Sequence, residues 1–171
     1  MEFNFSFDTA KEDVFRSVER FLKNEGLNIF SVDAKRPWGG FLVIDESQSE
    51  LFIKKFFTDL DNELIVTENR ISPKILIVAP YKRLSWQYHH RRSEVWKVLS
   101  DEVIVVLSDN DEEKNNTRYT TNDFVVINQG ERHRLVGLGS WGIIAEIWQH
   151  TNKDFPTDED DIVRVQDDYG R

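Results

Sequence analysis

The sequence is dominated by short apolar runs that follow one another at fairly even intervals. Ten runs of this kind lie between residues 41 and 148, and turn-forming residues separate most of them. They are residues 41–44, 51–57, 63–67, 75–78, 84–90, 95–99, 103–108, 124–127, 133–136 and 143–148. Runs of this length that are rich in β-branched and aromatic residues predict strands. Many short strands bounded by turns predict an antiparallel barrel or a double-sheet sandwich. We therefore expect an all-β protein.

One segment near the N-terminus has a helical pattern instead. Thr9 and Glu12 have the spacing of a capping box, in which both side chains satisfy free N–H groups of a first helical turn. The apolar residues that follow at helical spacing are Val14, Phe15, Val18, Phe21 and Leu22. Gly26 is placed to end the helix. The pattern predicts one amphipathic helix over residues 9–25, packed on the outside of the main fold; the alternative is that its apolar face binds a partner.

Length and composition exclude several classes of protein. A chain of 171 residues can bury the core of one domain, and its 31% charged and 12% aromatic residues are typical of a globular protein. The formal net charge of −9 argues against a nucleic-acid or anionic-membrane surface, although a local basic pocket for a phosphorylated ligand remains compatible with it. There are no cysteines, no secretory leader pattern and no apolar stretch of membrane-spanning length. We expect a cytoplasmic, soluble protein.

The candidate metal ligands cluster around the stretch SWQYHHRRSEVW, residues 85–96. Gln87 and His89 are two residues apart, so on a strand both side chains leave the same face, whereas His90 points away. A turn after His90 would bring Glu94 towards the same point, and His133 follows a glycine turn further along the chain. Nitrogen and oxygen ligands in this number suit zinc, manganese, iron or nickel. Gln87 is the weakest of the four candidate ligands because a neutral amide binds metal poorly. The alternative is that Gln87 only supports the other ligands and does not bind the metal itself.

This spacing resembles the two motifs of the cupin superfamily. At the positions of the first motif stand Tyr81, Gln87, His89, Glu94 and Asp101, and at those of the second stand Asn122, Asn128, Gly130, His133 and Gly137. Several structural positions are substituted, but the four metal positions keep residues that can bind a metal. The resemblance implies a double-stranded β-helix, which is a jelly-roll barrel.

A narrower resemblance rests on four segments in the right order. They are RPWGGF at 36–41, LSWQYHHRRSEVW at 84–96, GERHRL at 130–135 and EDDIVRVQDDYGR at 159–171. These segments are similar to the cupin domain of type II mannose-6-phosphate isomerases, a family in which glutamine is usual at the position of Gln87. The similarity covers residues 36–171, with an extra hairpin expected near 50–72 and a lengthened segment near 149–157. Residues 1–35 would then be a helical extension packed on the barrel, and the C-terminal tail would fold back over its mouth.

The resemblance implies a metal-dependent aldose–ketose isomerase that converts mannose-6-phosphate into fructose-6-phosphate through an enediol. It implies one divalent metal ion, with zinc as the first choice, a small sugar phosphate as ligand, and a homodimer. The sequence departs from the family pattern in two places. Arg91 stands where the family has a third histidine, and residues 1–35 lack the glycine-rich loop of the nucleotidyltransferase domain that many relatives carry, so this chain is not expected to make nucleotide sugars.

The remaining site candidates are charged residues. Lys74 aligns with a family lysine and could move a proton or bind phosphate, and Glu146 is a possible base; a metal-bound water is the third possibility, so the base stays open. Arg92, Arg132 and Arg164 could bind phosphate because guanidinium groups match its oxygens. For each of them, a surface ion pair is the alternative.

Two other functions are compatible with the same residues. A sugar-binding or regulatory cupin could keep the site and lack turnover, as the substitutions at Tyr81, Arg91 and Asp101 allow. Another cupin enzyme, such as an iron-dependent dioxygenase or a heptose-phosphate isomerase, is the second alternative. An iron requirement would distinguish the dioxygenase, and stabilisation by a sugar phosphate without conversion would distinguish the binding protein.

Overall fold

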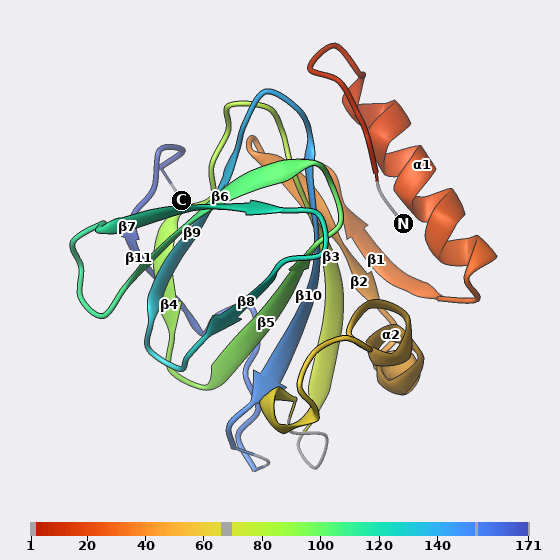
Figure 1. Ribbon diagram of the computed structural model, residues 1–171. Coiled ribbons are helices and arrows are strands. Elements are labelled where there is room, and N and C mark those ends of the chain that lie inside the picture. The colour runs from red at the N-terminus through yellow and green to blue at the C-terminus, as the bar shows by residue number, and fades with distance from the viewer. Residues whose placement is uncertain (1–2, 66–69, 153, 171) are drawn as a thin grey trace.

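Two antiparallel β-sheets face each other across the centre of the computed structural model, which describes residues 3–65, 70–152 and 154–170 (Figure 1). The first sheet has the strand order β1-β2-β3-β10-β5-β8 and the second has the order β11-β4-β9-β6-β7. Neighbours can be distant in sequence: β10 pairs with β3 along the whole length of β3. The prediction of an all-β jelly-roll barrel with an N-terminal helix is confirmed.

The strands are short, as the sequence pattern predicts. In the six-stranded sheet they are β1 (Ile29–Asp33), β2 (Gly39–Ile44), β3 (Ile71–Val78), β10 (Gly142–His150), β5 (Arg92–Val98) and β8 (Phe124–Ile127). In the five-stranded sheet they are β11 (Ile162–Gln166), β4 (Trp86–His89), β9 (Arg132–Gly137), β6 (Glu102–Ser108) and β7 (Asn115–Thr120). The sequence pattern missed β1, β7 and β11, because these three strands carry polar or exposed side chains instead of an apolar run.

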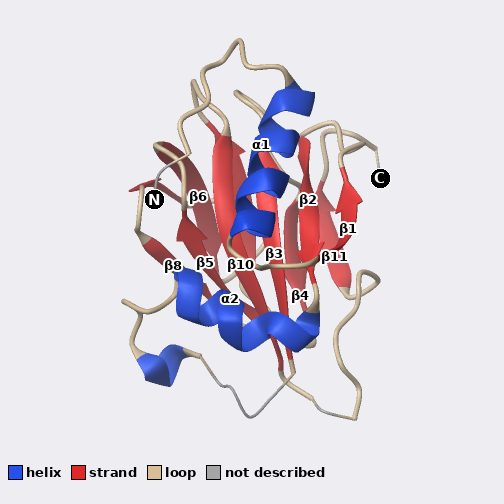
Figure 2. Cartoon of the chain, turned by 90° about the vertical axis from the view of Figure 1, so that its right-hand side faces the viewer, coloured by secondary structure: helices blue, strands red, loops and turns tan. Residues whose placement is uncertain are grey.

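The six-stranded sheet has an apolar cluster on each of its faces. The inner cluster lies between the two sheets and includes Trp96, Leu135 and Ile144. The outer cluster includes Ile143 and lies under the helices α1 (Lys11–Asn24) and α2 (Ser49–Phe56), which cover this face (Figure 2). Successive residues of a strand point to opposite faces, so β10 supplies both clusters at once. The outer helices therefore leave the barrel interior free for polar chemistry.

The first helix begins two residues later than predicted, and its cap differs. Ala10 is the N-cap residue and its side chain makes no capping hydrogen bond, so the capping box predicted from Thr9 and Glu12 is wrong. The C-terminal end follows the prediction. Gly26 has a φ of 76°, which is a left-handed conformation that glycine adopts without a steric penalty. The Leu27 N–H then donates to the Leu22 carbonyl at 2.9 Å and closes the last turn.

The helix α2 corrects the prediction of a strand over residues 51–57 and of a hairpin near 50–72. Its buried side chains, Phe52 and Phe56, are four residues apart and so share one face of a helix. An apolar run this short fits either periodicity, and packing against the sheet decides between them. The run predicted at 63–67 begins in a 3₁₀ turn, Asn62–Leu64, and its last two residues lie outside the described residues.

In the RPWGGF segment, Gly39 is required because β2 and β3 approach each other closely. A Cβ atom on Gly39 would lie only 1.9 Å from the Ile77 carbonyl oxygen, and the φ of Gly39 is 139°. Both facts exclude a larger residue at this position. Arg36 and Trp38, which precede the glycine, are thereby held at the mouth of the barrel pocket described below.

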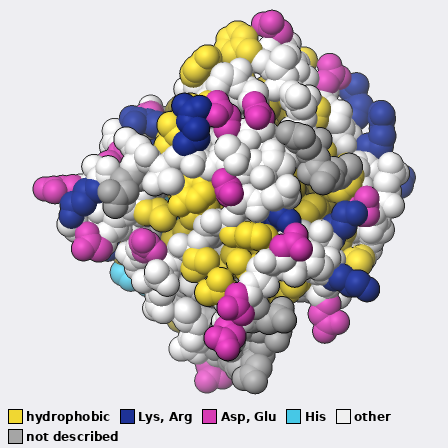
Figure 3. Space-filling model, in the orientation of Figure 1, with side chains coloured by type: hydrophobic (Ala, Val, Ile, Leu, Met, Phe, Trp, Pro, Cys, Tyr) yellow, Lys and Arg dark blue, Asp and Glu magenta, His cyan; other side chains and the backbone are white. Residues whose placement is uncertain are grey.

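The surface carries charges of both signs. Figure 3 shows scattered acidic and basic side chains around a central group of hydrophobic side chains, without a continuous basic area on the face in view. This agrees with the formal net charge of −9. Among the described residues, neither helix has the length and apolar character that crossing a membrane requires.

Candidate metal centre and active site

The strands β4, β5 and β9 bring three ligand-type side chains together inside the barrel. His89 Nε2 lies 3.4 Å from Glu94 Oε1, and His133 Nε2 lies 3.6 Å from Glu94 Oε2. One ligand atom from each residue lies within 4.8 Å of the other two. All three residues are at most 2% exposed. The structure therefore assembles two imidazoles and a carboxylate, a donor set that suits a divalent transition metal.

Backbone carbonyls orient both imidazoles. His89 Nδ1 lies 3.0 Å from the Asp161 carbonyl oxygen, and His133 Nδ1 lies 3.0 Å from the Glu131 carbonyl oxygen. A carbonyl only accepts, so each Nδ1 carries the proton and each Nε2 presents its lone pair. Metal-binding histidines are commonly held in this way by a partner behind the ring.

The protonation state of the histidines also fits a metal. Burial lowers the pKa of His89 to about 3, and it lowers the pKa of His133 below its ordinary value. Both rings are therefore neutral at neutral pH, as metal ligands must be. His133 Nε2 is buried and has no hydrogen-bond partner in the described part of the chain. Since buried polar atoms are almost always satisfied, this atom is a specific sign of an additional ligand.

Gln87 lies beside this set but has a different bonding pattern. It pairs with His133 across β4 and β9, on the face predicted for it. Its Oε1 accepts a hydrogen bond from the Ser85 hydroxyl at 2.6 Å. One lone pair of the amide oxygen remains for a metal, so the geometry allows both a fourth ligand and the supporting role.

Arg92 covers the ligand atoms from the side of the pocket. Its Nε donates to Glu94 Oε1 at 2.7 Å, and one of its terminal nitrogens lies 3.0 Å from His89 Nε2. Its guanidinium carbon lies 3.4 Å from the centre of the Trp148 ring, in cation–π geometry. Burial would raise the pKa of Glu94, but Arg92 and the two imidazoles outweigh it and lower that pKa. Glu94 is thus an anion, and it can bind either the Arg92 guanidinium or a metal ion.

A narrow pocket opens next to Arg92 at the barrel mouth, with a cavity volume of about 70 Å³. The charged side chains that line it include Lys74, Arg92, Glu146, Glu159 and Arg164. Four of the five predicted catalytic and substrate-binding residues are among them. A pocket that combines cationic and carboxylate groups with the ligand set suits an anionic ligand that undergoes proton transfer.

Glu146 is a buried carboxyl group on β10. Trp96 Nε1 donates at 3.0 Å both to Glu146 Oε1 and to Glu94 Oε2, so one indole joins the two carboxyl groups. Burial and the nearby charge of Glu94 raise the pKa of Glu146 well above its ordinary value. A carboxyl group in this state binds a proton more readily than an exposed one, which is a property of general acid–base groups.

Lys74 lies opposite Glu146 in the pairing of β3 with β10. Its ammonium group is 3.2 Å from the centre of the Trp148 ring and 2.5 Å from Glu159 Oε1. Burial lowers the pKa of Lys74, while Glu159 and Glu146 oppose that effect. The Lys74 side chain is only 6% exposed whereas that of Glu159 is 64% exposed, so a solvent-facing carboxylate binds a buried cation at the pocket mouth.

Two predicted residues lie elsewhere. Arg132 pairs with Asp111 at 2.8 Å and lies over the Tyr88 ring; it does not line the pocket, so the structure does not bring it to the site. His90 is exposed, on the side of the hairpin away from the ligands, as predicted.

Sequence reasoning missed several contributors. The two tryptophans, Trp96 and Trp148, are buried and also contact the charged groups of the site. Their spacing of two residues from Glu94 and Glu146 is the signal that could have indicated it. Asp161 accepts hydrogen bonds from the His90 and Arg91 N–H groups. Its acidic surroundings in the sequence gave no sign of this.

Comparisons with known proteins show the family of the chain. Residues 61–167 match the family model described as "Mannose-6-phosphate isomerase C-terminal". The chain is 31% identical over 136 residues to the xanthan biosynthesis protein XanB of Xanthomonas campestris pv. campestris, covering 80% of this chain and 23% of that protein. It is 30% identical over 134 residues to mannose-1-phosphate guanylyltransferase 2 of Escherichia coli O157:H7, covering 78% of this chain and 22% of that protein. The chain thus spans about a quarter of the length of these curated relatives.

Among solved structures, a cupin 2 conserved barrel protein from Salinispora arenicola is 19% identical, with a TM-score of 0.40 over 46% of this chain and 62% of that one. An oxalate oxidase in complex with glycolate is 21% identical, with a TM-score of 0.45 over 56% of this chain and 46% of that one. The family model matches more than half of the chain, and this match shows the family. The chain belongs to the family of mannose-6-phosphate isomerase C-terminal domains.

Proposed function

We propose that the chain is a metal-dependent aldose–ketose isomerase that interconverts mannose-6-phosphate and fructose-6-phosphate through an enediol. The observation that carries the proposal is the buried set of His89, Glu94 and His133 beside a pocket that also contains the perturbed pair Lys74 and Glu146. Family membership supports the substrate class, since the matched family is defined by mannose-6-phosphate isomerases.

The three buried ligands, with Gln87 as a possible fourth, would hold one divalent ion, zinc being the first choice for two imidazoles and a carboxylate. A bound divalent ion supplies electrostatic stabilisation of negative charge that develops on substrate oxygens.

The chain's own side chains supply the proton transfer. Isomerisation moves one proton between two neighbouring carbons, so it needs a single group that first accepts and then donates. Glu146 suits this role because burial and the charge of Glu94 raise its pKa, so that it binds a proton more readily than an exposed carboxylate, and Trp96 fixes its position. The same indole N–H also donates to Glu94, so Trp96 links Glu146, the proposed proton carrier, to one of the candidate ligands.

Cationic side chains would bind the phosphate. The contact between Lys74 and the Glu159 carboxylate supports this role, because Glu159 reaches the ammonium group from the mouth of the pocket. Arg164 lines the same mouth from β11. We assign phosphate binding to Lys74 and Arg164, with Glu159 displaced on binding, and we do not assign it to Arg132.

A coupled isomerase assay tests the proposal. The protein is stripped with a chelator and then given zinc, manganese, iron or nickel separately, with mannose-6-phosphate as substrate. We expect at least one metal to restore turnover, His133→Ala to abolish it, and His90→Ala to leave it within twofold, since His90 is exposed on the same hairpin. Glu146→Gln should lower kcat roughly 10²–10⁴-fold while metal binding is retained.

One observation favours a second function, a sugar-phosphate-binding cupin without turnover. Arg92 already donates to the ligand atoms of His89 and Glu94, so these two ligand-type residues have a cationic partner within the protein itself. No turnover with any metal, together with a rise in Tm on addition of mannose-6-phosphate, would establish this alternative and refute the isomerase.

A further inference from the structure

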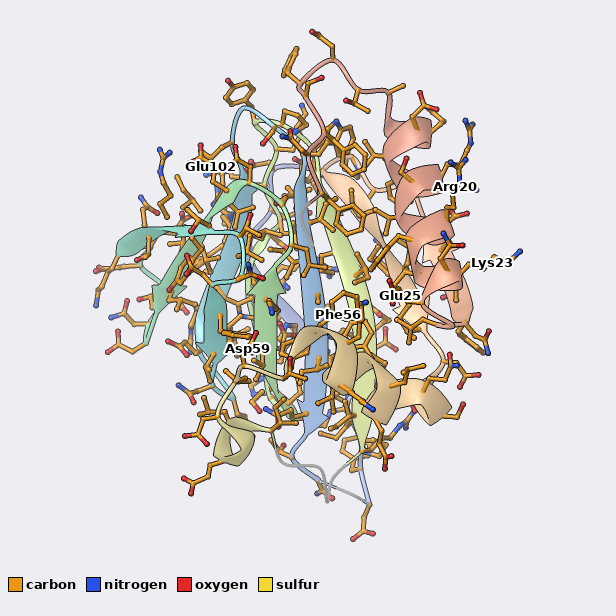
Figure 4. All side chains as sticks on the ribbon, turned by 45° about the vertical axis from the view of Figure 1, so that its right-hand side comes forward. Arg20, Lys23, Glu25, Phe56, Asp59 and Glu102 are labelled. Atoms are coloured by element: carbon orange, nitrogen blue, oxygen red, sulfur yellow. The ribbon has the colours of Figure 1, made fainter. Side chains whose placement is uncertain are left out.

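A second cavity lies on the opposite side of the six-stranded sheet, outside the barrel. Its volume is about 160 Å³. It is lined by Phe3, Lys55, Phe56, Lys97, Leu99 and Asn122. Figure 4 shows Phe56 on α2 and Asp59 in the loop after it, over the outer face of the sheet. The cavity therefore belongs to the helix-covered side of the molecule and shares no lining residue with the barrel pocket.

Lys97 is the unusual member of this lining. Its side chain is only 8% exposed, because β5 directs it under α2 and not into the barrel. Its ionic partner is Asp59, whose carboxylate is 80% exposed and 3.8 Å away, beyond hydrogen-bond distance. The ammonium group also lies 5.0 Å from the centre of the Phe124 ring. A nearly buried charge normally has a close, buried partner, which Asp59 does not provide.

A second cation faces the same space. Lys55 lines the cavity from α2 and pairs with Glu25 at 2.5 Å, where both side chains are about one-third exposed. Neither Glu25 nor Asp59 is among the lining residues, so the described lining carries two ammonium groups and no carboxylate. In a chain with a net charge of −9, this lining is locally basic.

The rest of the lining sets the chemical class of the anion. Phe3, Phe56 and Leu99 present apolar surface, and Asn122 adds an amide that can donate a hydrogen bond. An apolar cavity of roughly 150 Å³ is large enough for benzene. We propose that this cavity binds a small organic carboxylate that carries one apolar ring, with the carboxylate on Lys97 and Lys55.

Calorimetric titration of the full chain with benzoate tests this proposal. We expect one saturable site, at least tenfold weaker binding in Lys97→Met, and no saturable binding of benzyl alcohol, which has the ring without the charge. Lys54→Met is the matched control, because Lys54 is exposed on the same helix and does not line the cavity; its affinity should stay within twofold of wild type.

Two further variants keep the test decisive. Asn122→Gly removes the amide at a residue whose φ of 75° glycine adopts readily, so the backbone is preserved and binding should weaken. Lys74→Met should leave benzoate affinity unchanged, because Lys74 belongs to the barrel pocket. Absence of benzoate binding, unchanged affinity in Lys97→Met, a loss in Lys74→Met, or equal affinity for inorganic phosphate would each overturn the assignment. None of these results depends on isomerase activity.

Discussion

Glu94 is the side chain on which the buried polar groups of the barrel depend most. It accepts hydrogen bonds from Arg92 and Trp96, and it lies within 3.6 Å of both imidazole Nε2 atoms. A buried guanidinium is tolerated only while an anion compensates its charge. The same carboxylate thus serves both the stability of the fold and the ligand set.

We expect Glu94→Gln to lower the free energy of unfolding by about 3 kcal/mol, because the substitution leaves the Arg92 charge buried without an anion. The measurement is urea denaturation with a chelator present, so that metal loss does not contribute. Glu102→Gln is the control, since the Glu102–Arg118 pair is partly exposed (Figure 4) and should contribute less than about 1 kcal/mol. Equal effects of both variants would show that Arg92 does not need Glu94.

At the scale of elements, the C-terminal segment is what completes the site. The strand β11 pairs with β4 and so extends the sheet that carries Gln87 and His89. Just before β11, Asp161 holds the β4–β5 turn through two backbone N–H groups, while its own carbonyl orients His89. The Thr157 hydroxyl donates to the same carboxylate at 2.7 Å. Residues 157–166 thus support His89, one of the candidate metal ligands, from behind its ring.

We expect Asp161→Ala to weaken metal binding roughly 10–100-fold although no ligand is changed, because the support behind His89 is loosened. Competition with a chromophoric chelator measures this affinity. Asp160→Ala, at the exposed neighbouring position, should stay within twofold of wild type. If both variants bound metal like wild type, the C-terminal segment would have no part in forming the site.

At the scale of the whole molecule, the two faces of the six-stranded sheet have separate tasks. The outer cluster, which includes Phe52, packs the helices, whereas the barrel interior contains the ligand set. Phe52 is fully buried and its ring centroid lies 4.7 Å from that of Phe56. Stability and chemistry are therefore expected to respond to different substitutions.

We expect Phe52→Ala to lower the free energy of unfolding by about 3–5 kcal/mol through the cavity that it leaves, while metal affinity of the folded protein stays within twofold. Leu51→Ala, at a position that is 40% exposed, should change stability by less than about 1 kcal/mol. Urea denaturation and metal titration below the unfolding transition measure the two quantities. A parallel loss of metal affinity would show that the two faces are coupled.

The sequence by itself determined the all-β class, the first helix and the candidate ligand set. These depend on local properties: alternation of side chains along a strand places Gln87 and His89 on one face, and a short turn returns the chain to Glu94. The proposed substrate class, a sugar phosphate, came from the family resemblance, because no periodicity in a sequence specifies a substrate. The strands β1, β7 and β11 escaped prediction because pairing with neighbours, and not their own composition, makes them strands.

Only the tertiary structure decided how these residues bond. The run at 51–57 lies mostly in a helix and not in a strand, because two phenylalanines four residues apart pack on the sheet. The tertiary structure placed Arg92 on the ligand atoms and left Arg132 outside the pocket, although both arginines flank predicted ligands. It joined Lys74 to Glu159, which are 85 residues apart in sequence. Contacts of this kind depend on side-chain geometry between strands that are distant along the chain, and local sequence patterns do not encode that geometry.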